Sequence, residues 1–315
     1  MKKELMISFL CGLMIVAGTA CTTSDEPGGE EQIVKKRFLT INPDQGAASP
    51  RRILKATIND EGTTLSSSWT AGDGLSYCNL SRQELVNPDP ETYAVYTGPL
   101  TAIETKPISS LTGDVECTKD DYLAVVYPAN NTFVFEYISA GTKYKYHFPL
   151  SGQDGTLEGL AANFHQVYGR AHVTEVTDKT ADATMDKMQS LLTVCKFSFE
   201  DEANPGVAIK VKTLTIKYED ATSDNGKYPQ KGEVTVLVTT TNIEATTAKY
   251  DVTGPLVIEC PAEQEEVYVA LMPEIASRTY NFTVTNSVGT WSGTAEAHLQ
   301  RGTFVPATGL ILTKN

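Results

Sequence analysis

The stretch LLTVCKFSFED, residues 191–201, decides the fold, because its side chains alternate in character. Its apolar side chains share one face of an extended chain: Leu191, Cys195, Phe197 and Phe199. The side chains of the opposite face are polar: Lys196, Ser198 and Glu200. A period of two residues is typical of a β-strand with one face in the core and the other in water.

The same period recurs throughout the second half of the chain. It is clearest in four segments: KTLTIKYED (212–220), GEVTVLV (232–238), TYNFTVT (279–285) and TWSGTAEAHL (290–299). Three further segments are apolar enough to be strands: KYDVTGPLVIE (249–259), VYVALMP (267–273) and TFVPATGLILT (303–313). About eight short strands, separated by Gly, Pro, Asn and Asp turns, predict an antiparallel sandwich.

The first half shows a looser version of this pattern. Its candidate strands are KRFLTINPD (36–44), RRILKATIND (51–60), SSWTAGDGLSYCNL (67–80), TYAVYTG (92–98), DYLAVVYP (121–128), NTFVFEYIS (131–139) and YKYHFPL (144–150). One helical segment is expected in GTLEGLAANFH (155–165). Residues 175–190 are polar and show no strand alternation, so we place a domain boundary there. The predicted fold class is all-β, with two antiparallel β-sandwich domains in series at residues 34–180 and 181–315.

The N-terminus has the parts of an export signal. A basic start, apolar residues 5–17 and small residues 18–20 precede Cys21. This order resembles a bacterial lipobox and predicts a signal peptide at residues 1–20, with lipid attachment at Cys21. The acyl chains on that cysteine would anchor the protein to a membrane. The alternative is an ordinary secretory signal cut after Ala20, with the cysteine as a bystander.

Residues 21–33 form the next segment, and most of it is small, acidic and rich in Gly and Pro. This composition predicts a flexible lipidated tether rather than part of a core. An acidic run after a lipidated cysteine is similar to the surface-export signals of some Gram-negative lipoproteins. We therefore expect a surface-exposed lipoprotein of the cell outer membrane.

The charge of the chain excludes one class of partner. The formal net charge is −13, and Lys and Arg gather only in VKKR and PRR. Phosphate binding needs a basic face, so nucleic acid is not an expected partner.

The cysteines predict neither a metal site nor a redox motif. Of the six cysteines, Cys11 lies in the signal and Cys21 is the candidate lipid site. The others are scattered singly, with no CxxC pair: Cys78, Cys117, Cys195 and Cys260. We expect buried free thiols, and export leaves disulfides open in three possible pairings.

Catalytic motifs are absent from the sequence. There is no GxSxG, HExxH, Walker or dinucleotide-binding pattern. The histidines are expected to be solvated or locally bonded: His147, His165, His172 and His298. Acidic residues gather in DEANPG (201–206) and EDATSDNG (219–226), but both segments are typical of hairpin turns. We therefore predict no enzyme activity, no metal and no cofactor, and a hydrolase is kept as an alternative.

The aromatic residues allow another alternative, a glycan-binding surface lipoprotein. The chain has 14 tyrosines and two tryptophans, which could stack against sugars. However, Tyr218, Tyr280 and Trp291 fall in the inward register of their predicted strands. Aromatic residues in that register more often fill a core.

Five segments match one family when they are taken together. They are WTAGDGLSYC (69–78), YLAVVYPANN (122–131), FPLSGQDGTLEGL (148–160), VYVALMPEI (267–275) and HLQRGTFVPATGLIL (298–312). In these segments the chain resembles the fimbrillin family, the lipoprotein-derived subunits of type V pili in Gram-negative anaerobes. The resemblance spans nearly the whole mature chain. It implies two transthyretin-like β-sandwich domains and a structural, tip or anchor subunit of a fimbrium that acts in adhesion.

The family further implies polymerisation by strand exchange. A trypsin-like protease, arginine-specific in the best-known systems, removes the first strand, and the C-terminal strand of another subunit fills the groove. Here Arg51 and Arg52 follow the candidate first strand, so a cut after Arg52 would release that strand with the lipid; the alternative is that both are solvated charges. A cut after Arg37 would leave the strand attached. The implied partners are other fimbrial subunits, through β-strand addition, the outer membrane, through the lipid, and a host or bacterial surface ligand.

The C-terminal segment is apolar on both faces. The candidate donor-strand residues are Phe304, Val305, Ala307, Leu310, Ile311 and Leu312. Such a strand is expected to be buried, either by closing its own domain or by complementing a neighbouring subunit. Pro306 fits an edge position in either case. The chain continues only to Asn315, which argues against a stalk role and leaves a tip, accessory or anchor role open.

Overall fold

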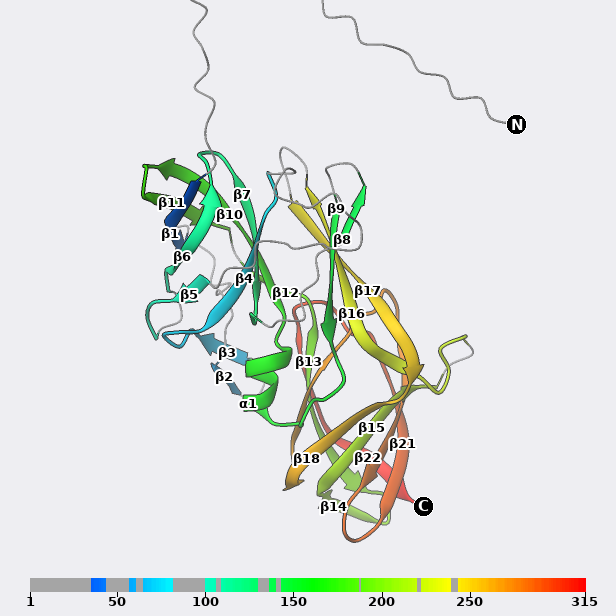
Figure 1. The fold of residues 1–315 in the computed structure, drawn as a ribbon. Coiled ribbons are helices and arrows are strands. Elements are labelled where there is room, and N and C mark those ends of the chain that lie inside the picture. Colours follow the sequence, from blue (N-terminus) through cyan, green and yellow to red (C-terminus); the bar gives the residue numbers. More distant parts are fainter. Residues whose placement is uncertain are drawn as a thin grey trace, which may run out of the picture. The chain divides into compact units, whose positions relative to one another are not determined.

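The computed structural model describes residues 35–43, 57–60, 65–81, 100–105, 109–129, 136–139, 143–186, 188–219, 222–238 and 243–315. Figure 1 shows these residues as strands with one short helical segment. They all belong to one compact unit that spans residues 34–315. The all-β prediction is confirmed. No helix in this described part is long and apolar enough to cross a membrane.

The first sheet closes on itself. Its strands are β1 (Lys35–Pro43), β4 (Gly74–Asn79), β5 (Leu100–Ala102), β6 (Leu111–Cys117), β7 (Tyr122–Tyr127), β10 (Val167–Val176), β11 (Thr180–Met185) and β12 (Gln189–Ser190). Their order is β11-β1-β6-β5-β4-β7-β10-β12, and β11 also pairs with β10. This extra pairing makes the sheet a barrel. The barrel interior is filled by a core that includes Leu39, Ile41, Trp69, Val125 and Val173.

The second sheet stays open. Its strands are β13 (Thr193–Asp201), β14 (Asn204–Ile209), β15 (Val211–Tyr218), β18 (Leu256–Gln264), β19 (Val267–Leu271), β20 (Arg278–Thr285), β21 (Thr290–Ala297) and β22 (Phe304–Lys314). The order is β14-β13-β22-β21-β20-β15-β18, and β19 pairs with β13. The predicted inward residues of β13 are buried: Cys195, Phe197 and Phe199. Among the described strands, β1 pairs in parallel with β11, and β13 pairs in parallel with β22.

A third sheet joins the two halves of the chain. It contains β8 (Glu136–Ser139), β9 (Lys143–Pro149), β16 (Tyr228–Val238) and β17 (Ile243–Gly254), in the order β17-β16-β9-β8. Phe148 of β9 lies opposite Gly232 of β16. A Cβ atom at Gly232 would lie 2.1 Å from the Phe148 ring, so this close pairing needs glycine. A small hairpin, β2 (Thr57–Asp60) with β3 (Leu65–Ser68), completes the described strands.

The interpretation of residues 175–190 as lacking strand alternation is wrong. β11 alternates regularly, with Ala181, Ala183 and Met185 buried and the residues between them exposed. Alanine is too small to mark an apolar period as clearly as the larger residues of β13 do. Both β11 and β12 belong to the first sheet, so sheet membership changes between Ser190 and Thr193.

The expected helical segment is present but short. It consists of α1 (Leu157–Gly159) followed by one π-helical turn, η2 (Leu160–Phe164). The Thr156 side chain caps its start by accepting from the Gly159 N–H at 2.9 Å. The buried Leu160 and Phe164 side chains join the core of the second sheet.

Gln153 connects the two halves just before this segment. Its side chain is 3% exposed. The Nε2 group donates to the Leu150 carbonyl at 2.9 Å and to the Ala270 carbonyl at 3.0 Å, and Oε1 accepts from the Ala270 N–H at 2.7 Å. The amide therefore bonds β19 as a neighbouring strand would. One hydrophobic core continues through this region, because Cys78 and Val126 of the first sheet pack with the second.

Candidate functional site

The first strand of the described chain is held on both sides. β1 pairs with β6 over Lys35–Ile41 and with β11 over Phe38–Pro43. Leu39 and Ile41 point into the barrel and are fully buried, whereas Phe38 points outward and is 50% exposed. The candidate releasable strand is therefore an internal part of the barrel.

Arg37 lies at the start of this strand and is itself buried, with 7% of its surface exposed. It occupies the inward register, two residues before Leu39. Its Nε donates to the Thr177 carbonyl at 2.7 Å, and its Nη1 donates to the Cys117 carbonyl. These carbonyls belong to the β10–β11 turn and to the end of β6. The backbone N–H of Phe38 also donates to the same turn, to the Lys179 carbonyl at 3.0 Å.

The other N-terminal candidates lie outside the described residues. These are the lipid site Cys21 and the dibasic pair Arg51 and Arg52. The described chain leaves β1 at Pro43 and resumes at Thr57, so the dibasic pair falls between β1 and β2.

The C-terminal strand belongs to its own sheet. β22 pairs with β13 from Phe304 to Leu312, and with β21 only through Thr313 and Lys314. Within the single chain, only one face of β22 is well buried. Leu312 is buried, Ile311 is 52% exposed, and the remaining candidates are partly buried against the core: Phe304, Val305, Ala307 and Leu310. One face of the strand packs on the core, whereas Ile311 points away from it beside Glu200 of β13.

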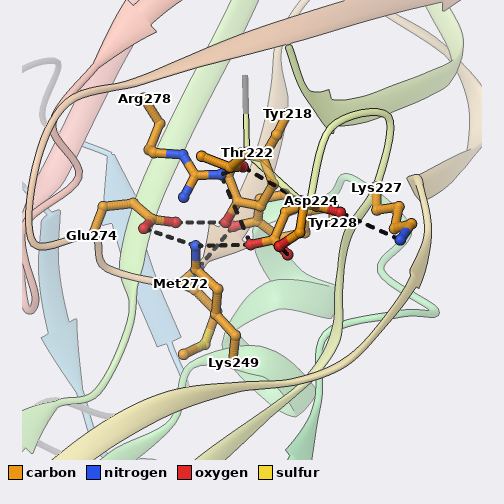
Figure 2. A network of polar contacts seen from close by, with 10 residues as sticks. Tyr218, Thr222, Asp224, Lys227, Tyr228, Lys249, Met272, Glu274 and Arg278 are labelled. Carbon is orange, nitrogen blue, oxygen red and sulfur yellow. Dashed lines mark hydrogen bonds and ion pairs between the residues drawn. The ribbon is translucent and has the colours of Figure 1, made fainter. Parts of the chain in front are cut away.

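A polar network joins Tyr218 of β15, Lys249 of β17 and Arg278 of β20 to two acidic side chains (Figure 2). The Tyr218 hydroxyl donates to Glu274 Oε1 at 2.5 Å, and Lys249 Nζ lies 3.0 Å from Glu274 Oε2. The Arg278 guanidinium carbon lies 4.1 Å from the centre of the Tyr218 ring, and its Nη2 lies 3.9 Å from Asp224 Oδ2. Lys249 Nζ is 4.5 Å from the same ring centre. Four charged groups of this network therefore lie beside an opposite charge: Asp224, Lys249, Glu274 and Arg278.

The electrostatics of the network favour a structural role. Burial raises the pKa of Tyr218 well above its ordinary value, and the neighbouring Tyr228 and Glu274 raise it further. A tyrosine that holds its proton this firmly is a poor general base or nucleophile. The network instead ties Lys249 of the β16–β17 hairpin to the loop before β16, through Asp224, and to the loop before β20, through Glu274.

The cysteines are buried and form no disulfide: Cys78, Cys117, Cys195 and Cys260. The prediction of buried thiols is confirmed. Burial raises the pKa of Cys78 to about 12, and that of Cys260 to about 11. Such thiols are protonated at neutral pH and are not activated nucleophiles. Within the described ranges, no three His, Cys, Asp or Glu side chains gather in a way that could hold a metal ion.

The structure also shows the surroundings of two histidines and three aromatic residues. His147 Nε2 lies 3.1 Å from Glu233 Oε2, and His298 Nε2 lies 3.0 Å from the Glu274 carbonyl, so both are locally bonded as expected. The aromatic residues expected to face inward do so: Tyr218, Tyr280 and Trp291 are at most 5% exposed. These three rings therefore offer no platform for stacking against a sugar.

Sequence reasoning missed the structural roles of two residues. As part of a basic run, Arg37 suggests only a cleavage site, although its inward register with Leu39 and Ile41 is a signal that the strand buries it. Gln153 stands out in the sequence only as part of a family-like segment. Its amide binds Ala270 at a sequence separation of 117 residues, a contact that no local pattern indicates.

Comparisons with known proteins find only distant structural similarity. No family model matches the chain, and no curated protein matches it significantly. One similar crystal structure is that of a protein from Bacteroides ovatus proposed to act in cell adhesion. It is 15% identical to this chain with a TM-score of 0.48, and the alignment covers 90% of this chain and 97% of that chain. A similar protein from Bacteroides uniformis shares 11% identity and a TM-score of 0.42, covering 83% and 97%. The full-length major pilin SpaD of Corynebacterium diphtheriae shares 9% identity and a TM-score of 0.21, covering 89% and 98%.

Proposed function

We propose that the chain is a non-catalytic cell-surface lipoprotein that serves as a structural, tip or anchor subunit of an adhesive fimbrium. Neighbouring subunits are joined by strand exchange. The structural likenesses are too distant to carry the argument, so the proposal rests on this chain's own residues. The observation that carries it is the position of β1, which fills the barrel between β6 and β11 and is followed by a dibasic segment.

Loss of β1 would open a slot suited to another strand. The slot would expose the unpaired edges of β6 and β11 together with the barrel core around Leu39 and Ile41. Fully burying two such aliphatic side chains contributes roughly 3–6 kcal/mol. An open slot is therefore a strong site for strand addition, in which backbone bonds supply affinity and alternating pockets supply register.

The donor in this proposal is β22 of another subunit. Among the described strands, residues 304–312 of β22 pair on one side only, with β13. A strand with one ladder along most of its length leaves its sheet at lower cost than a strand with two. The alternative is that β22 only closes its own sheet, which suits an anchor subunit that keeps its lipid.

The cleavage step is tested with the mature chain and an arginine-specific trypsin-like protease. Intact mass is expected to show a cut after Arg52, and size-exclusion chromatography is expected to show polymers. The Arg51→Gln, Arg52→Gln double variant is expected to stay monomeric. Arg301→Gln, which changes an exposed arginine elsewhere, serves as the matched control and is expected to polymerise. A chain that loses β1 and remains a monomer would refute strand exchange.

The lipid anchor is tested in cells with a clickable palmitate analogue. Cys21→Ser is expected to abolish labelling. Cys11→Ser, which changes the other N-terminal cysteine, is expected to leave labelling intact. Equal labelling of both variants would overturn the assignment of Cys21.

A further inference from the structure

The buried guanidinium of Arg37 joins three separate segments of the barrel. The residue belongs to β1, and its two bonded carbonyls belong to Cys117 and Thr177. These acceptors are 80 and 140 residues away in sequence. The side chain therefore bridges β1 to both of its structural neighbours, β6 and the β10–β11 turn.

Arginine is suited to this position in a way that lysine is not. The planar guanidinium presents several N–H donors in a fixed fork, so one side chain can reach two carbonyls in different directions. A lysine ammonium is a single, strongly hydrated point charge. Hydrogen bonds from a charged donor are also stronger than neutral ones, and leaving their buried partners without bonds is costly.

The same burial affects proteolysis at this residue. The peptide bond after Arg37 lies inside a strand whose flanking residues are paired to β6 and β11. Proteases cut exposed, unpaired segments, so this bond is cut only when β1 opens locally. The rate of such cleavage follows the population of the open form. Lys36, one residue earlier, points outward, and its side chain is 65% exposed.

We propose that Arg37 is a latch for β1, which closes the KKRF site to trypsin-like proteases and slows the departure of β1 after a cut farther along the chain. The second of these effects rests on the strand exchange proposed above, whereas the first does not. Together they direct cleavage to sites outside the strand, so that β1 leaves whole rather than in part. The latch also keeps a cut subunit closed for longer, which gives a donor strand time to arrive.

The protective effect is tested on the uncut chain by a trypsin time course with mass mapping. Arg37→Lys keeps a trypsin site but loses the fork. We expect the bond after residue 37 to be cut at least about tenfold faster in this variant than in the wild type. Lys36→Gln serves as the matched control and is expected to keep wild-type protection of that bond. Equal protection in Arg37→Lys and the wild type would overturn the latch.

Hydrogen exchange separates a local latch from a loss of folding. In Arg37→Gln, the amides of residues 38–41 are expected to exchange at least about tenfold faster, while those of β13 keep their wild-type rates. Faster exchange in both strands would show general destabilisation, and unchanged exchange in β1 would show no latch. Either result would refute the proposal.

The effect on strand departure is read from the cut chain. After cleavage at Arg52, release of the β1 peptide is followed by native mass spectrometry. Release from Arg37→Lys is expected to be at least about tenfold faster than release from the wild type. Equal release rates would limit Arg37 to protection and remove its role in departure. If the cut chain releases β1 but forms no polymer, strand exchange fails while the protection measured on the uncut chain stands.

Discussion

Replacing Gln153 by leucine is expected to lower the stability of both the barrel and the second sheet, because one hydrophobic core continues through both. The substitution keeps a similar volume but removes bonds to both the N–H and the C=O of Ala270 and to the Leu150 carbonyl. Ala270 is fully buried, so water cannot replace these bonds. Each buried polar group left without a partner costs about 1–3 kcal/mol. We expect a loss of roughly 2–5 kcal/mol, a large part of the about 5–15 kcal/mol that is typical of a folded domain.

Urea denaturation with tryptophan fluorescence measures this loss and locates it. The two tryptophans are buried in different sheets, since Trp69 lies in the barrel core and Trp291 lies in β21. The Trp69→Phe and Trp291→Phe backgrounds therefore report each half separately. In Gln153→Leu, both transitions are expected to move to lower urea concentration.

The matched control is Gln300→Leu, because this glutamine is exposed. Its effect is expected to stay within about 0.5 kcal/mol. If Gln153→Leu changes the free energy of unfolding no more than this control does, the reasoning about the bridging amide is wrong. A shift of the Trp291 transition alone would show that the amide supports only the second sheet.

Three further predictions concern packing, pH and the polar network. Gly155→Ala should lower the thermal stability clearly more than Gly152→Ala does. Both glycines have a positive φ, so the backbone strain is similar. A Cβ atom at Gly155 would lie 2.8 Å from Val267, whereas a Cβ atom at Gly152 would have no neighbour within 4 Å. Because burial raises the pKa of Cys78 from 9.0 to about 12, the unfolded chain loses this proton at lower pH than the folded chain. The free energy of unfolding should thus fall as pH rises above about 9, and less steeply in Cys78→Ala, as measured by urea titration. Glu274→Gln removes the charge that pairs with a lysine and should lower stability by about 1–3 kcal/mol in the same assay.

Much of the second sheet could be predicted from local pattern. The strands at residues 193–201, 211–218 and 278–285 follow the period of two, and their inward residues are buried as expected. The pattern was clear because large apolar residues alternate with charged or hydroxyl-bearing ones. It failed at β11, where alanines carry the alternation. At β22, burial against a neighbouring subunit stays a prediction, because Ile311 is exposed within the single chain.

The pairing of distant segments could not be predicted in this way. Nothing local indicates that β11 closes the barrel against β10 and β1, or that β9 pairs with β16 across the expected domain boundary. Parallel pairing of β13 with β22 is equally invisible to periodicity, because a strand's alternation is the same in either direction. These strand pairings depend on which strand edges come together once the chain has collapsed.

By itself, the sequence determined the all-β class and the inward and outward residues of the regular strands, whereas the signal peptide and the lipidated tether stay predictions. It could do so because alternation, composition and turn residues act over a few neighbouring positions. Only the tertiary structure decided that Arg37 is buried and that Gln153 bridges the halves. Their partners lie 80, 117 and 140 residues away, and whether a polar side chain is exposed or bonded depends on which carbonyls the fold brings to it.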